Sequence, residues 1–133
     1  MKPVQIFSEY DFVCPEDENE PVEEQAVFTI CNLTVEQDAF LDDTIQGDVG
    51  LKFGSNILHV LNMGLKKIKW TAKIKGKSVE MKFERDPKGM SYPGNATPWK
   101  SKHLQQIPLR IRRIVAAKIR SLGELEEAEV KNS

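Results

Sequence analysis

The side chains that could carry nucleophilic or metal chemistry in this 133-residue chain are few and widely separated. Its two histidines, His59 and His103, have no neighbours that would complete a catalytic triad. Its two cysteines, Cys14 and Cys31, lack a CxxC spacing and a nearby histidine pair, which excludes the usual zinc sites. We therefore expect two free thiols, with Cys31 in a strand core, a partly buried and locally hydrogen-bonded His59, and a solvated His103.

Acidic residues are numerous, but their spacing does not suit acid–base catalysis. Asp42 and Asp43 are adjacent, and neighbouring residues diverge by about 100° on a helix. The acidic run at 15–20 is typical of a solvated loop, and neither a P-loop nor a GxGxxG fingerprint occurs. The sequence therefore predicts a protein that is not an enzyme, with no cofactor and no metal site.

Bulk composition is that of one soluble domain spanning 1–133, with 40% apolar and 29% charged residues. No apolar run is long enough to span a bilayer, so no membrane partner is expected. The N-terminus has no apolar core of a secretory signal, which favours a cytoplasmic location.

Charge is distributed unevenly along the chain. Residues 1–50 hold one lysine and thirteen acidic residues, whereas 51–123 hold seventeen basic and three acidic ones. Residues 124–133 hold one lysine and four glutamates. Three explanations stay open: the basic part meets an acidic partner, the acidic part folds over it, or two copies associate through opposite charges.

The N-terminal half predicts two strands, 4–13 and 25–33, on either side of an acidic loop at 14–25. A helix follows, because Thr34 and Gln37 form a capping-box pattern. Its apolar face holds Phe40, Leu41 and Ile45, and the glycines of 47–50 end it.

The second half predicts a helix capped by Ser55, with the apolar stripe Ile57, Leu58, Leu61, Leu65 and Ile68. The period then changes to two, which predicts a β-hairpin from Trp70 to Glu84 with one apolar and one lysine-rich face. A loop at 86–100 follows, and then a helix with Pro108 in its first turn and Gly123 at its end. We expect the tail 124–133 to fray.

Together these elements predict an α+β fold: an N-terminal strand pair, two central helices, a β-hairpin and a C-terminal amphipathic helix. Periodicity reports burial and not the partner, so each apolar stripe could be core or a binding face. The candidate partner-binding residues are Trp70 and members of the two stripes: Ile57, Leu58, Leu61, Leu65, Ile111, Ile114, Val115, Ile119 and Leu122.

Three segments in this order resemble the tail assembly chaperones of long-tailed phages. The first is FTICNLTVEQDAFLDD at 28–43, a strand followed by "L-T" and an acidic helix. The second is ILHVLNMGLKKIKW at 57–70, an apolar helix ending in Gly-Leu and a nearby tryptophan. The third is the C-terminal pattern of 104–133, with its "IP" helix start and glutamate-rich exit ending KNS. The lysine-rich hairpin departs from the pattern, in which a shorter aromatic-glycine turn is expected.

The resemblance implies a non-enzymatic protein that binds the tape measure protein, keeps it soluble and recruits tail tube subunits during tail assembly. It also implies action in the host cytoplasm, absence from the mature virion, and compatibility with a homo-oligomer.

Two alternatives come from other classes. A nucleic-acid-associated protein would use the basic region 66–120, where lysines lie near Trp70 and Phe83. Against it stand a pI near 6 and the expectation that Val79, Met81 and Phe83 form a buried face. A structural tail or head-completion protein, retained in the particle, is the second alternative.

Overall fold

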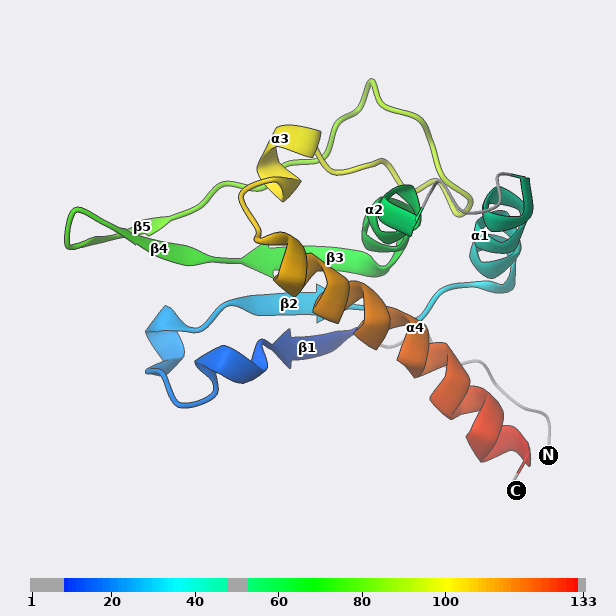
Figure 1. The fold of residues 1–133 in the computed structure, drawn as a ribbon, viewed down its shortest axis with the longest axis horizontal. Coiled ribbons are helices and arrows are strands. Elements are labelled where there is room, and N and C mark those ends of the chain that lie inside the picture. The colour runs from blue at the N-terminus through cyan, green and yellow to red at the C-terminus, as the bar shows by residue number, and fades with distance from the viewer. Residues whose placement is uncertain (1–8, 48–52, 132–133) are drawn as a thin grey trace.

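The computed structural model describes residues 9–47 and 53–131, with side chains for 9–43 and 56–122 (Figure 1). The predicted α+β class and order of elements are confirmed. Within the described ranges, none of the helices has the length and hydropathy of a membrane span. In chain order the elements are β1 (Tyr10–Val13), the 3₁₀ turns η1 (Pro15–Asp17) and η2 (Val22–Glu24), β2 (Val27–Ile30), α1 (Val35–Gly47), α2 (Phe53–Gly64), β3 (Leu65–Lys69), β4 (Thr71–Ile74), β5 (Lys77–Glu80), α3 (Ser101–Leu104) and α4 (Leu109–Lys131).

The main sheet is antiparallel, in the order β1-β2-β3. Phe28 in its central strand lies opposite Phe12 on one side and Ile68 on the other. Helix α4 crosses in front of the sheet and packs against α2, which in turn packs against α1 (Figure 1). One hydrophobic cluster joins all these elements, and its fully buried side chains include Phe28, Ile30, Leu41, Leu61, Met63, Leu65, Leu104, Ile107, Val115 and Ile119.

The predicted helix from Ser55 to Ile68 is wrong in its last turn, because α2 ends at Gly64 and the chain continues directly as β3. Pairing of β3 with the central strand β2 overrides the helical spacing of the apolar residues, since cross-strand packing decides strand formation. The Gly64 carbonyl accepts a hydrogen bond from Cys31 N–H at 2.9 Å, which fixes the change of direction. The expected Ser55 cap is wrong, because α2 begins at Phe53 and Ser55 lies inside the helix.

Helix boundaries elsewhere follow the sequence more closely. Gln37 N–H donates to Thr34 Oγ1 at 3.1 Å, and Thr34 N–H donates to Gln37 Oε1 at 3.0 Å, so the capping box is confirmed. The Pro108 carbonyl accepts from Arg112 N–H, which places Pro108 at the start of α4. The predicted end at Gly123 is wrong, because the helix continues to Lys131. Ile45 lies outside the described side chains, and 4–8 and 48–50 lie outside the described residues.

Candidate interaction surfaces

The β4–β5 hairpin projects from the body at one end of the molecule (Figure 1). Its turn is Lys75-Gly76, with φ of 53° and 78°, and two residues at positive φ are the geometry of the tight hairpin turns that match strand twist. Ala72 lies opposite Val79, and Ile74 lies opposite Lys77. The two strands form a sheet of their own, separate from β1-β2-β3.

One face of the hairpin is turned toward the acidic loop at 14–25. Lys73 Nζ lies 3.3 Å from a Glu24 carboxylate oxygen. Asp17 and Glu20 line the same shallow hollow, of about 260 Å³, together with Thr71 and Ser78. The acidic part of the chain therefore folds against the basic hairpin, which is one of the three explanations for the uneven charge.

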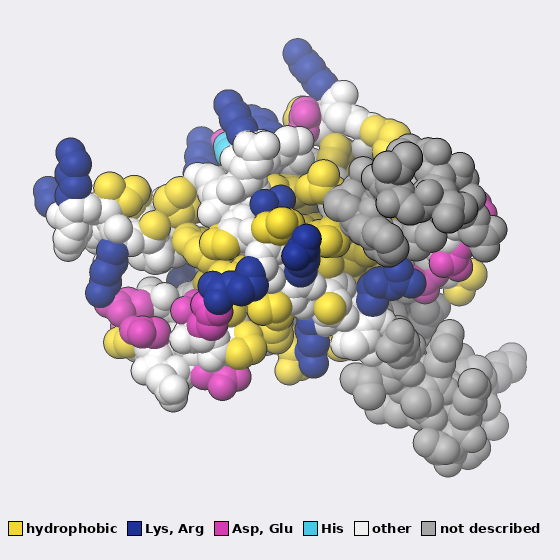
Figure 2. Space-filling view, in the orientation of Figure 1, with side chains coloured by type: hydrophobic (Ala, Val, Ile, Leu, Met, Phe, Trp, Pro, Cys, Tyr) yellow, Lys and Arg dark blue, Asp and Glu magenta, His cyan; other side chains and the backbone are white. Residues whose placement is uncertain are grey.

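The opposite face of the hairpin, formed by Ala72, Ile74 and Val79, is open. Ile74 is 49% exposed and Val79 is 40% exposed, so the predicted burial of this alternating face is wrong for its outer part. The hairpin projects beyond the described helices (Figure 1). Figure 2 shows hydrophobic side chains on the hairpin next to the lysines at its tip. We call these three residues the apolar hairpin face.

Arg85, a partly buried cation, lies just after the hairpin and connects it to the body of the molecule. Arg85 donates to the carbonyl oxygens of Asn62 (3.1 Å), Leu65 (2.7 Å) and Thr97 (2.8 Å). Its guanidinium also lies 3.9 Å from the centre of the Trp99 ring, a cation–π contact. Burial lowers the pKa of Arg85 from its ordinary value. The side chain thus donates to the Asn62 carbonyl in the last turn of α2, where the helix dipole is negative. Among the described residues it forms no ion pair with a carboxylate.

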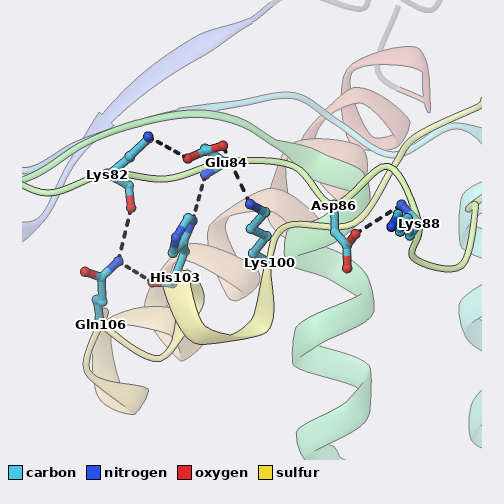
Figure 3. A network of polar contacts seen from close by, with 7 residues as sticks. All are labelled: Lys82, Glu84, Asp86, Lys88, Lys100, His103 and Gln106. Atoms are coloured by element: carbon cyan, nitrogen blue, oxygen red, sulfur yellow. Dashed lines mark hydrogen bonds and ion pairs between the residues drawn. The ribbon is translucent and has the colours of Figure 1, made fainter.

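A polar network connects the segment after β5 to α3 (Figure 3). Glu84 pairs with Lys82 at 2.9 Å and with Lys100 at 3.6 Å. The hydrogen bond from Lys82, and then the charge of Lys100, lower the pKa of Glu84. His103 Nδ1 accepts from Glu84 N–H at 3.0 Å, so the prediction of a solvated His103 is wrong. The one-turn helix α3, which the sequence did not predict, places this half-buried ring against the backbone at Glu84.

A second hollow, of about 290 Å³, lies between α2 and the loop that precedes α3. We call it the α2 hollow. Met90 lines it and is 58% exposed. Its remaining lining combines apolar and polar side chains: Leu58, His59, Asn62, Asp86, Gly89, Tyr92, Pro98, Trp99, Ser101 and Leu104.

Long-range hydrogen bonds fix the wall of the α2 hollow. His59 Nδ1 lies 2.7 Å from Tyr92 Oη, and Asn62 Nδ2 donates to the same oxygen at 3.0 Å. Asn62 Oδ1 accepts from Trp99 N–H at 2.9 Å. His59 is partly buried as predicted, but this partner lies 33 residues away rather than nearby in the sequence.

Both cysteines are buried thiols outside any disulfide, as the sequence predicts, but Cys31 lies one residue beyond the end of β2 and not within the strand. Among the residues that the structure describes, no three His, Cys, Asp or Glu side chains come together in a way that could hold a metal ion.

The candidate partner-binding residues fall into two groups. Leu61, Leu65, Ile111, Val115 and Ile119 are buried in the core of the chain itself. Ile57, Leu58, Trp70 and Leu122 are partly buried and pack against that core, and Ile114 is also half-buried. Of all ten, Leu58 alone lines the α2 hollow.

The loop residues of the α2 hollow were missed from the sequence. The sequence feature that could have indicated them is the presence of Met90, Tyr92 and Trp99 in a loop rich in proline and glycine. Apolar residues in such a loop follow no helical or strand period, so a search for periodicity does not find them.

Comparisons of the chain with protein-family models, with curated proteins and with solved structures find no match.

Proposed function

We propose that this chain is a non-enzymatic tail assembly chaperone that binds the tape measure protein of a long-tailed phage and helps to recruit tail tube subunits. It acts in the host cytoplasm and leaves before the virion is complete. The proposal is supported by the three segments that resemble the family. In the structure the first contains β2 and the start of α1, the second contains most of α2 and β3, and the third contains α4.

The observation that carries the binding role is the α2 hollow. At about 290 Å³ it lies at the lower limit of small-molecule pockets, and it suits an apolar side chain of a partner better than a cofactor. Met90 is exposed beside it, and methionine adapts its shape to varied apolar partners. A long helical client would place one residue of its apolar stripe in the hollow, as in helix-in-groove recognition.

Titration of the chain with a coiled-coil fragment of the tape measure protein tests this proposal. Trp99 lines the hollow, so its fluorescence in a Trp70→Phe background should change on binding. We expect Met90→Glu to weaken binding by about tenfold or more, because a carboxylate would replace apolar surface that the client covers on binding.

Val22→Glu is the matched control, since Val22 is exposed on η2 and does not line the hollow. No binding of the fragment to the well-folded wild-type chain would overturn the chaperone proposal. Equal affinity of wild type and Met90→Glu would instead show that the client binds elsewhere.

A nucleic-acid role has one observation in its favour. Arg110, Arg113 and Arg120 are exposed along one face of α4, at a spacing that aligns them on a helix. Arg110 pairs with Glu16, however, and Trp70 and Phe83 pack against the core rather than offering a stacking surface. DNA binding that weakens steeply with salt, and that Arg113→Ser with Arg120→Ser abolishes, would favour this second candidate.

A further inference from the structure

The outer face of α1 is apolar at its centre and acidic at its borders. Val35 is 70% exposed, and Ala39, one turn later, is exposed as well. Glu36, Asp42 and Asp43 are exposed around them. None of these three carboxylates has an ion-pair partner within the described part of the chain.

The apolar hairpin face is the complement of this surface. Its exposed Ile74 and Val79 lie beside Lys77, which points to the same side of the hairpin because it is opposite Ile74. Lys75 in the turn is exposed too, and neither lysine forms an ion pair with a described residue. The hairpin thus has an apolar centre with basic borders, and α1 has an apolar centre with acidic borders.

These two surfaces cannot meet within one molecule. The hairpin lies at one end of the long axis and α1 at the other (Figure 1). We propose that α1 of one copy docks on the apolar hairpin face of the next, which gives a head-to-tail association. Such a contact uses two different surfaces, so it does not close at a dimer and can continue as a chain or ring. The proposal does not depend on the chaperone role.

The contact should be weak and sensitive to salt. Each surface offers only a few exposed side chains, well below the area of a stable interface. Exposed ion pairs contribute modestly and are screened within about 8 Å at physiological ionic strength. We therefore expect association only at high protein concentration, with partial dissociation as salt is raised.

Sedimentation velocity of the full chain, over a range of concentrations at low and high salt, tests the proposal. The hairpin variant Ile74→Ser with Lys77→Ser and the α1 variant Val35→Ser with Asp42→Asn should each raise the apparent dissociation constant by about tenfold or more. All four positions are exposed, so the fold should persist, and circular dichroism checks that it does. Lys88→Ser is a control at an exposed position outside both surfaces.

Mixing the two variants gives the sharpest result. The hairpin variant retains an intact α1 and the α1 variant retains an intact hairpin, so an equimolar mixture should form 1:1 dimers and nothing larger. Wild-type protein that stays monomeric at low salt and high concentration would overturn the proposal. So would variants that associate like wild type, or a mixture that forms no dimer.

Discussion

At the scale of the residue, Arg85 joins the α2–β3 junction to the loop before α3, which is distant from that junction in the sequence. Its guanidinium binds carbonyls of α2, β3 and the loop after the hairpin, and it also covers Trp99. Several carbonyl dipoles replace the water that this partly buried cation loses, and they stabilise its charge. The hairpin root and the α2 hollow share this anchor, so both depend on one side chain.

Replacing Arg85 with methionine should lower the free energy of unfolding by about 3 kcal/mol, because buried carbonyls lose their donors. Urea denaturation measures the change. Arg113→Met, on the exposed face of α4, should stay within about 0.5 kcal/mol of wild type. Equal effects of the two substitutions would contradict the anchoring role.

Glu84 predicts a pH dependence of stability. Its pKa is lowered by Lys82 and Lys100, so the folded state favours the charged carboxylate. This contribution is complete above the ordinary pKa of 4.5 and is lost as pH falls through the lower value of the folded state. Glu84→Gln should therefore differ from wild type in melting temperature at neutral pH and converge with it in acid. Glu23→Gln, on an exposed carboxylate of η2 without an ion pair among the described residues, should show no such convergence.

At the scale of the element, the junction of α2 and β3 is the least expected feature. Leu61, Leu65 and Ile68 follow a helical spacing, yet the last two belong to a strand. The sequence could not reveal this change, because it depends on the pairing of β3 with β2 and on the approach of α4 to Gly64. A Cβ at Gly64 would lie 2.5 Å from Ile119 Cγ2.

Gly64→Ala should therefore destabilise the protein by about 1 to 3 kcal/mol, although alanine is the better helix former. Ile119→Ala alone should cost about 2 to 5 kcal/mol as a cavity. The double variant should be more stable than the sum of the single effects predicts, since removal of Cγ2 relieves the clash. Strict additivity in denaturant titrations would argue against the steric account.

The capping box of α1 was predicted from Thr34 and Gln37 alone, because both partners lie within one helical turn. Its tertiary role could not be predicted. Gln37 Nε2 also donates to the Pro93 carbonyl at 3.0 Å, which ties α1 to the loop after the hairpin.

Thr34→Ala should cost about 1 kcal/mol through loss of the cap. Gln37→Ala should lower stability more, because the buried Gln37 side chain also donates a hydrogen bond to the Pro93 carbonyl in the loop. Thermal unfolding of both variants measures the order of the two effects, and a larger loss for Thr34→Ala would contradict it.

At the scale of the whole molecule, the sequence predicted the class and the order of elements, because strand and helix periods differ and the boundaries carry caps, glycines and prolines. It did not predict which surfaces stay open. Val79 follows the same alternation as a buried strand residue, and only the projection of the hairpin exposes it. The α2 hollow could not be predicted either, since Met90 and Trp99 line it together with α2 but are far from α2 in the sequence.

The central claim, that this chain protects a long helical client, is tested most directly by co-expression with the tape measure protein. The measured quantity is the fraction of that protein that remains soluble. We predict that wild type raises this fraction, that Val22→Glu does so equally, and that Met90→Glu does so much less. A soluble fraction that is the same with and without the well-folded chain would contradict the claim.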